Sequence, residues 1–557
     1  MNDMTTQSKK RRSGATPKGR QVDPSALSQV RDALGAQPRE RALLIEHLHT
    51  LQDRFGHLST AHLVALASEM RLAMAEVYEV ATFYAHFDVV DQGTAPPPAV
   101  TVRICDSLTC CMLGADKVYE ETQARLSSQD VRVVRAPCMG ACDTAPAAAI
   151  GHTLIEHADA EALVAAVGTG ANRPIKAKAL DAYRAEGGYD LLEKCLAGGV
   201  SADAVIQALD GSGLRGLGGA GFPTARKWSI VRDQPGPKAV AVNADEGEPG
   251  TFKDREFLET DPHRMLEGAM IGAWVVGASD VYIYLRDEYP EARHVLEAEI
   301  PNIEAAGIAP HVKLHLRRGA GAYICGEESA MIESIEGKRG LPRHRPPYVA
   351  QVGLFGRPTL VNNVETLFWV RDIVEKGAAW FADQGQDGHP GPRTYSVSGR
   401  VKNPGVKIAP SGTTVRQLIE DYCGGMADGH AFKAYLPGGP SGGILPASMG
   451  DLPLDFGQLE KYGSFVGSHA VVILSTQDSV KDAALNLMRF FAHESCGQCT
   501  PCRVGTEKAA DLMADGNWDT ALLTELSTAM RDTSICGLGQ AASNPITSVM
   551  TYFSEDL

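Results

Sequence analysis

Two groups of cysteines constrain this chain more than any other feature of its sequence. Near the C-terminus, "ESCGQCTPCRVG" places Cys496, Cys499 and Cys502 at C-x2-C-x2-C spacing, and Cys536 follows in "SICGLGQ". Structural zinc sites usually pair two short C-x2–4-C hairpins, whereas three neighbouring thiols with one distant thiol form the ferredoxin pattern. We therefore predict a [4Fe–4S] cluster on these four cysteines, with tetrahedral zinc as the alternative.

The other group has a two-plus-two layout. Cys105 and Cys110 form a C-x4-C pair, Cys138 and Cys142 form a C-x3-C pair, and each pair follows an apolar, strand-like segment. This layout also suits zinc, but loops of this spacing let each pair bind one iron of a [2Fe–2S] cluster. We favour the [2Fe–2S] cluster, because two clusters in one chain would form an electron-transfer path. Cys111, next to Cys110, is expected to be a packed thiol.

Composition limits the class of protein. At 557 residues the chain is too long for one hydrophobic core, so three or more domains are expected. Its net charge of −15 argues against a nucleic-acid binder, and no apolar run approaches the roughly 18 residues of a membrane span. The basic start, "MNDMTTQSKKRRSGATPKGR", lacks the apolar core of a signal peptide. We expect a cytoplasmic protein, in which clustered cysteines bind metal rather than form disulfides.

The pattern of apolar residues changes along the chain. In residues 25–90 apolar residues recur at helical spacing, which predicts a bundle of about four helices. Strand–loop–helix units typical of a doubly wound sheet follow the first cysteine group. From about residue 394, two short strands and a helix indicate a β-grasp-like module, and residues from 482 onward are mostly helical. The fold class is therefore a multidomain α/β protein.

Two loops offer binding chemistry. "GLRGLGGAGFPTARKW" has glycines that allow backbone N–H groups to approach a phosphate, and Pro223 and Thr224 begin a helix whose N-terminus favours an anion. A flexible loop is the alternative, because no apolar strand precedes it. "NADEGEPGTFKDR" follows an apolar strand, where open α/β sheets bind ligands. Its carboxylates are expected either to hold ribityl or ribose hydroxyls or to cap the next helix.

These stretches, together with "GAGAYICGEESAMIESIEGKRGLPRHRPPYVA" and "PTLVNNVETL", resemble the flavoprotein subunit of bacterial complex I and its relatives over residues 180–557. Residues 25–170 resemble the family's separate thioredoxin-like [2Fe–2S] subunit, here fused in front. The resemblance implies an NADH:acceptor oxidoreductase that carries FMN and binds NAD. It also implies the following organisation: a disordered basic tail (1–24), a helical bundle (25–92), a thioredoxin-like [2Fe–2S] domain (97–170), a Rossmann-like FMN/NAD-binding domain (177–393), a β-grasp (SLBB) domain (394–478) and a helical [4Fe–4S] domain (479–557).

The resemblance also implies site residues at the matching positions. For FMN these are Gly216, Gly218, Gly219, Lys227, Asn243, Asp245, Gly326, Glu327, Asn362, Asn363 and Thr366. For the nicotinamide nucleotide they are Phe222, Glu248, Tyr323, Glu328 and Tyr348. Leu217 departs from the family, which carries an arginine there, and the polar contact expected of that arginine is in doubt. Glu246 and Glu248 are expected to favour NAD over NADP by repelling a 2′-phosphate.

Within this family the C-terminal sequence, including "SGRVKNPGVKIAPSGTTVRQLIEDYCGGM", is most similar to the β-subunit of NAD-dependent molybdenum or tungsten formate dehydrogenase. The implied partner is a catalytic α-subunit. The alternatives are a complex I fusion and the diaphorase subunit of NAD-reducing hydrogenase, which is expected to lack the full N-terminal cysteine set. The flavin would perform hydride transfer, so no residue is expected to act as an acid or base.

Two other classes of protein remain open at this point. One is a non-catalytic binding module with zinc in both cysteine groups. The other is an enzyme that uses Cys325 as a nucleophile, which we disfavour because the neighbouring Glu327 and Glu328 would raise its pKa.

Overall fold

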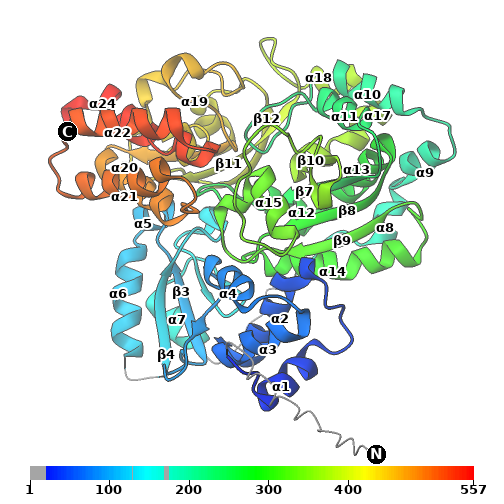
Figure 1. Cartoon of the computed structure of the whole chain (residues 1–557). Coiled ribbons are helices and arrows are strands. Elements are labelled where there is room, and N and C mark those ends of the chain that lie inside the picture. The colour runs from blue at the N-terminus through cyan, green and yellow to red at the C-terminus, as the bar shows by residue number, and fades with distance from the viewer. Residues whose placement is uncertain (1–19, 128–129, 168–174) are drawn as a thin grey trace, which may run out of the picture.

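The structure is a computed structural model that describes residues 20–127, 130–167 and 175–557, so most of the expected basic tail lies outside the described residues. Figure 1 shows several α/β and helical parts packed against one another. The first is the predicted bundle of four helices, α1 (Pro24–Leu34), α2 (Leu44–Phe55), α3 (Thr60–Met70) and α4 (Met74–Phe83). Asp23 caps α1 with Pro24 at its first position, and Ser59 caps α3. None of the helices in the described ranges is long and apolar enough to cross a membrane.

The second part carries the first cysteine group on a four-stranded sheet. Its strand order is β4-β3-β5-β6, with β3 (Val100–Cys105) parallel to β4 (Val131–Ala136), and with β5 (Ala148–Ile150) and β6 (Thr153–Ile155) forming the predicted hairpin. It also contains α5 (Leu108–Met112), α6 (Ala115–Leu126) and α7 (Ala160–Ala166). Cys105 ends β3, whereas β4 ends two residues before Cys138, so both cysteine pairs lie at the same end of the sheet.

The third part is built on a parallel four-stranded sheet of order β10-β7-β8-β9. Its strands are β7 (Lys238–Ala244), β8 (Ala278–Leu285), β9 (Lys313–Arg318) and β10 (Thr359–Asn363). β7 and β8 are almost continuously apolar because helices cover both faces of a parallel sheet. The helices are α8 (Leu180–Ala185), α9 (Asp190–Leu196), α10 (Ala202–Gly211), α11 (Thr224–Arg232), α12 (Lys253–Thr260), α13 (Pro262–Val276), α14 (Pro290–Ala305), α15 (Glu328–Ile335), α16 (Val364–Phe368), α17 (Val370–Lys376) and α18 (Ala378–Ala382).

The fourth part is built on a five-stranded sheet of order β12-β11-β15-β13-β14. It consists of β11 (Pro392–Gly399), β12 (Gly405–Pro410), β13 (Phe432–Leu436), β14 (Leu445–Pro446) and β15 (Ala470–Ser475), with α19 (Val415–Gln417) after the first hairpin. The chain then ends in α20 (Val480–His493), α21 (Thr500–Ala514), α22 (Thr520–Thr533), α23 (Gly537–Ala541) and α24 (Asn544–Tyr552). The multidomain α/β class predicted from the sequence is therefore confirmed.

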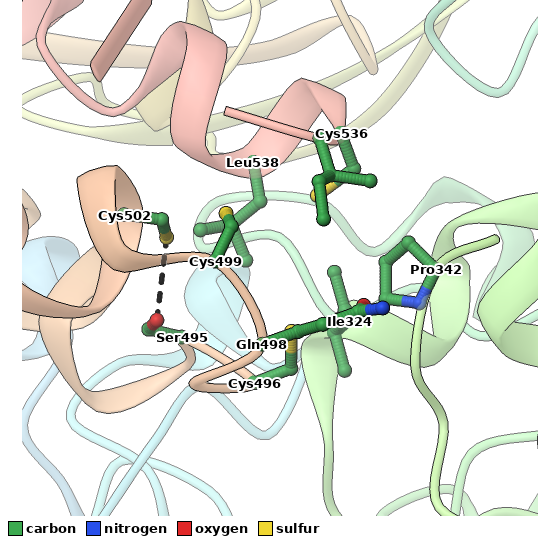
Figure 2. A pocket seen from close by; sticks show the side chains of 10 residues that line it. Ile324, Pro342, Ser495, Cys496, Gln498, Cys499, Cys502, Cys536 and Leu538 are labelled. Carbon is green, nitrogen blue, oxygen red and sulfur yellow. Dashed lines mark hydrogen bonds between the residues drawn. The ribbon is translucent and has the colours of Figure 1, made fainter. Parts of the chain in front are cut away.

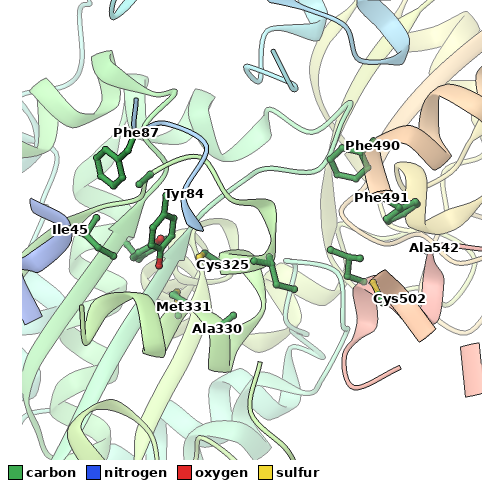
Figure 3. Packing of buried hydrophobic residues seen from close by; sticks show 14 of the residues in the cluster. Ile45, Tyr84, Phe87, Cys325, Ala330, Met331, Phe490, Phe491, Cys502 and Ala542 are labelled. Carbon is green, nitrogen blue, oxygen red and sulfur yellow. The ribbon is translucent and has the colours of Figure 1, made fainter. Parts of the chain in front are cut away.

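One apolar cluster connects the N-terminal bundle, the parallel-sheet domain and the C-terminal helices. Figure 3 shows Tyr84 and Phe87 from the bundle near Cys325 and Met331, and Phe490 at the far side of the same cluster. The Tyr84 hydroxyl also lies 2.8 Å from both the Ser334 Oγ and the Lys338 carbonyl oxygen. The fused N-terminal region is therefore packed into the core of the chain and is not merely tethered to it.

Candidate functional site

The four C-terminal cysteines line one small cavity (Figure 2). Cys496 and Cys499 lie on the loop between α20 and α21, Cys502 lies in the first turn of α21, and Cys536 precedes α23. The rest of the lining is mainly apolar, from Ile324, Pro342, Ile535 and Leu538, with Ser495 and Gln498 at the loop. Burial raises the pKa of Cys502 to about 11 and that of Cys536 to about 12, so metal binding is needed to hold these groups as thiolates. A three-plus-one set of thiols around an apolar cavity fits a [4Fe–4S] cluster.

The N-terminal cysteines also converge. Cys105, Cys110, Cys138 and Cys142 are all buried, the Cys138 and Cys142 Sγ atoms are 3.5 Å apart, and Cys105 interacts with the thiols of both Cys110 and Cys138. Cys138 and Cys142 pack against Phe252 of the parallel-sheet domain. The Cys111 Sγ donates instead to the Asp106 carbonyl oxygen at 3.1 Å, as expected of a packed thiol. The set fits a [2Fe–2S] cluster held by one pair of thiols on each iron.

A cleft with a volume of about 360 Å³ lies at the carboxyl ends of β7 and β10, and it shares the lining residues Ile324 and Leu538 with the four-cysteine cavity. The glycine loop forms one side, where a Cβ added to Gly218 would come within 3.0 Å of the Asn363 Cβ and Gly219 has a φ of +123°. Side chains at these two positions would be strained or crowded, so the sequence requires glycine there. The acidic loop after β7 forms the floor. The backbone can therefore approach a bound phosphate or ribityl chain closely.

Nine of the predicted nucleotide-binding residues line this cleft: Gly218, Gly219, Asn243, Asp245, Glu248, Tyr323, Gly326, Glu327 and Asn363. The Asn243 amide donates to the Gly326 carbonyl oxygen at 2.8 Å and so fixes the two loops together. One carboxyl oxygen of Asp245 is buried without a hydrogen-bond partner, and burial raises the pKa of this group well above its usual value. An unpartnered acceptor in a glycine-lined cleft fits the hydroxyl groups of FMN.

The other seven predicted residues lie behind or outside the cleft lining. The Leu217 N–H donates to the Thr366 Oγ at 2.9 Å, and Trp228 donates to the Asn362 side chain at 2.9 Å, so Thr366 and Asn362 hold the glycine loop from behind. Lys227 donates to the Val361 carbonyl oxygen at 3.2 Å, and Gly216 donates to the Phe222 carbonyl oxygen at 2.8 Å. Glu328 pairs with Arg345 at 3.1 Å, and the Phe222 and Tyr348 rings are 37% and 54% exposed.

The cleft also contains residues that the sequence analysis did not select. The Lys253 ammonium is 1% exposed and lies 2.9 Å from an Asp254 carboxylate oxygen and 2.8 Å from a Glu365 carboxylate oxygen. The Asn363 amide donates to Asp254 at 2.6 Å, so this buried ion pair orients a predicted FMN residue. Lys253 and Asp254 belong to the acidic motif and could have been chosen from it. Ser441, Phe465 and Ser468 come from the five-stranded sheet domain and carried no sequence signal.

Glu246 also lines the cleft, and its carboxylate is engaged by the next helix. Its carboxylate accepts from the Asp254 N–H at 2.9 Å, from the Arg255 N–H at 3.1 Å and from the Tyr289 hydroxyl at 2.9 Å. It therefore caps the N-terminus of α12, which is the second of the two uses that the sequence allowed for the acidic loop.

A glycine-lined cleft together with two sets of four thiols defines an oxidoreductase module that uses a flavin and iron–sulfur clusters. Four family models match the chain: the thioredoxin-like [2Fe–2S] ferredoxin (residues 30–169), the Nuo51 FMN-binding domain (209–372), the SLBB domain (394–445) and the NADH-ubiquinone oxidoreductase-F iron–sulfur binding region (482–557). The chain belongs to the family of the F subunits of NADH-quinone oxidoreductases, and its cofactors are FMN, NAD, a [4Fe–4S] cluster and a [2Fe–2S] cluster.

Relatives cover different shares of the chain. It is 42% identical over 392 residues to the NADH-quinone oxidoreductase F 2 subunit of Rhizobium meliloti, covering 68% of this chain and 93% of that protein. It is 41% identical over 393 residues to the NADH-quinone oxidoreductase F subunit of Aquifex aeolicus, covering 68% of this chain and 90% of that protein. A chain of the NAD+-reducing [NiFe]-hydrogenase crystal structure in the H2-reduced state superposes with a TM-score of 0.82 at 33% identity, covering 93% of this chain and 92% of that chain.

Proposed function

We propose that this chain is the diaphorase subunit of an NAD-dependent formate dehydrogenase. In this role it exchanges hydride between NAD and FMN and single electrons with its clusters, and it receives electrons from formate oxidation in a partner α-subunit. The observation that carries the electron-transfer role is that Ile324 and Leu538 line both the flavin cleft and the four-cysteine cavity. Two redox sites that share a wall can exchange electrons without a further carrier.

The residue assignments follow the cleft and the two cysteine sites. Gly216, Gly218, Gly219, Lys227, Asn243, Asp245, Gly326, Glu327, Asn362, Asn363 and Thr366 would hold FMN, either directly or by supporting the loops that do. The nicotinamide nucleotide would contact Phe222, Glu248, Tyr323, Glu328 and Tyr348. Cys496, Cys499, Cys502 and Cys536 would bind the [4Fe–4S] cluster, and Cys105, Cys110, Cys138 and Cys142 the [2Fe–2S] cluster. When bound, the flavin supplies hydride transfer and the conversion between electron pairs and single electrons.

The residues of the chain itself would bind and orient the flavin and the nucleotide and exclude water from the cleft. Ser441 and Ser468 close the cleft from the five-stranded sheet domain: the Ser441 N–H donates to Glu248 at 3.1 Å, and the Ser468 and Thr251 hydroxyls are 2.8 Å apart. These contacts join two domains, so they hold the Ser441 and Ser468 segments of the five-stranded sheet domain over the acidic loop. A closed, mostly apolar wall toward the [4Fe–4S] site keeps water out of the electron-transfer path.

The assignment to formate dehydrogenase rests on the resemblance of the C-terminal amino-acid sequence to that family. A second candidate, the diaphorase subunit of an NAD-reducing hydrogenase, is favoured by the superposition that covers 93% of this chain, including its N-terminal region. A complex I fusion is supported by relatives that cover 68% of the chain. Location in the cytoplasm also remains a prediction.

Three experiments test the proposal. The purified chain, replete with iron and FMN, should reduce a dye with NADH, and the absence of any such activity would overturn the diaphorase role. It should contain about six iron and six labile sulfide per chain, whereas two zinc and no flavin colour would support a structural binding module. Copurification of the native complex with metal analysis then separates the partners. Molybdenum or tungsten supports formate dehydrogenase, nickel supports hydrogenase, and neither metal supports complex I.

A further inference from the structure

Arg286 joins the [2Fe–2S] loop to the flavin cleft. It follows the last residue of β8 and is 5% exposed. One end of its guanidinium donates to the Cys138 carbonyl oxygen at 2.6 Å, and the other donates to the backbone carbonyl oxygen of Glu246, a residue of the flavin cleft. One buried cation therefore contacts both redox sites.

The cysteine loop is seated closely over this arginine. Arg286 lies 4.9 Å from the centroid of the Tyr289 ring, and the same ring packs beneath Gly140. A Cβ added to Gly140 would lie 2.3 Å from the Tyr289 hydroxyl oxygen. The loop between Cys138 and Cys142 thus lies against the Arg286 side of the interface with no room for an intervening side chain.

The charge of Arg286 is only partly balanced. Two of its nitrogens face neutral carbonyl groups, and its Nε donates to Glu288 at 3.1 Å, where the Glu288 side chain is 25% exposed. Asp245 also acts on it electrostatically, and burial raises the pKa of Asp245 well above its usual value, which disfavours the charged form of that carboxyl group. Arg255 offers a contrast at the same interface, since its guanidinium lies 3.2 Å from the carboxylate of Asp143, the residue after Cys142.

We propose that Arg286 is a positioning residue that raises the reduction potential of the [2Fe–2S] cluster. Reduction adds one electron, and hence one negative charge, to the cluster and its four thiolates, and no bond is broken. A guanidinium remains charged at any pH at which the protein is folded, and in a water-poor interface its attraction for the added charge is weakly screened. Hydrogen bonding, net charge and solvent exposure are the factors that set such potentials. The inference rests on the proposed [2Fe–2S] ligands.

The test is a redox titration of the purified full chain with dithionite, in which the [2Fe–2S] signal is followed by electron paramagnetic resonance. Arg286→Gln should lower the equilibrium constant for reduction at least tenfold, which is about 59 mV for a one-electron couple. Arg286→Lys, which keeps the charge but cannot reach both carbonyl groups, should give a smaller decrease. Glu288→Gln removes the partly balancing negative charge and should shift the potential in the opposite direction, upward.

Arg255→Lys is the matched control, because it disturbs a buried arginine at the same interface but keeps the positive charge that pairs with Asp143. Its equilibrium constant for reduction of the [2Fe–2S] cluster should stay within threefold of the wild-type value. The [4Fe–4S] potential, measured in the same samples, should not change in any variant, since Arg286 does not line that cavity.

The outcomes are separable. A wild-type chain without any [2Fe–2S] signal refutes the ligand assignment, whereas a normal signal with equal potentials in wild type and Arg286→Gln refutes the role of Arg286. Equal decreases in Arg286→Gln and the charge-conserving Arg255→Lys indicate a purely structural effect and also refute it. If Arg286→Gln does not assemble a cluster, the Glu288→Gln variant tests the role of Arg286 instead. A [2Fe–2S] potential in Glu288→Gln that does not rise above the wild-type value overturns the proposal.

Discussion

Ile324 and Leu538 form a common apolar wall between the flavin cleft and the four-cysteine cavity. Ile324 comes from the turn before α15 and is 4% exposed, and Leu538 comes from α23 and is 7% exposed. Because the two segments are more than two hundred residues apart in the chain, this shared wall, and with it the proposed electron path, forms only when the C-terminal helices pack onto the parallel-sheet domain. The consequences of this packing can be tested one feature at a time.

Cys499→Ser should remove the [4Fe–4S] cluster and leave the flavin cleft intact, because Cys499 does not line that cleft. We expect the iron content to fall by about four per chain, with FMN bound and still bleached by NADH, while electron delivery to or from the partner is lost. Iron analysis and anaerobic flavin absorbance measure this. Cys195→Ser, at a buried cysteine outside both cavities, is the control and should keep all its iron. Loss of FMN in Cys499→Ser would contradict the separation of the two sites.

Gly140→Ala should prevent the [2Fe–2S] loop from docking. The added methyl would overlap the Tyr289 ring, and the φ of Gly140 is +67°, which strains a side chain. The expected result is a loss of about two iron per chain, with FMN and the [4Fe–4S] signal retained. Gly151→Ala, at a glycine with φ of +60° but open space around its Cβ position, separates strain from the clash. If both variants lose iron equally, the contact with Tyr289 is not the cause.

Cys325 should be inert. It is buried beneath Tyr84 and Tyr284, and burial raises the pKa of its thiol to about 12. At pH 7 the thiolate is then about one part in 10⁵, so iodoacetamide should not modify it in the folded chain, and Cys325→Ser should keep NADH:dye activity. Mass spectrometry of alkylated peptides with and without urea measures the modification. Rapid labelling of the folded protein that matches the loss of activity would restore the nucleophile hypothesis.

Glu246 should make the chain less stable as the pH rises through the acidic range. Burial raises its pKa from 4.5 to about 7 in the folded state. Between these values the folded chain binds more protons than the unfolded chain, so the free energy of unfolding falls with increasing pH, by up to about 3 kcal/mol, and is level above pH 7. Thermal unfolding midpoints of the FMN-free chain should therefore be lower at pH 8 than at pH 6, and Glu246→Gln should reduce that difference. An identical pH dependence in the two proteins would argue against it.

Glu248 and Glu246 should differ in their effect on nucleotide choice. Both residues line the cleft, but the carboxylate of Glu246 is occupied by the first turn of α12 and by Tyr289. Glu248→Gln should raise the ratio of kcat/KM for NADPH to that for NADH about tenfold, which corresponds to about 1.4 kcal/mol of relieved repulsion. Glu246→Gln should leave the ratio unchanged. Steady-state kinetics with both nucleotides measure it, and equal ratios in wild type and Glu248→Gln would count against charge-based selection.

Short-range patterns in the sequence predicted much of this protein. The four N-terminal helices, the strand that ends at Cys105, the β5–β6 hairpin and the alternation of strands and helices after residue 238 all follow from local periodicity and caps. Cysteine spacing predicted which thiols come together, because three of the four C-terminal cysteines lie within seven residues of one another. The domain boundaries and the nucleotide contacts remain predictions.

Other features were decided by contacts between residues far apart in the chain. Nothing near Glu246 in the sequence indicates that Tyr289 and Arg286 would engage its loop, and nothing near Ser441 indicates that it would cover Glu248. The sequence by itself determined which elements form and which thiols can share a metal, because these depend on neighbours along the chain. Only the tertiary structure decided which apolar residues, cations and carboxylates surround those sites. Burial of apolar surface brings distant segments together, and the polar groups buried with them form hydrogen bonds with whichever groups lie next to them.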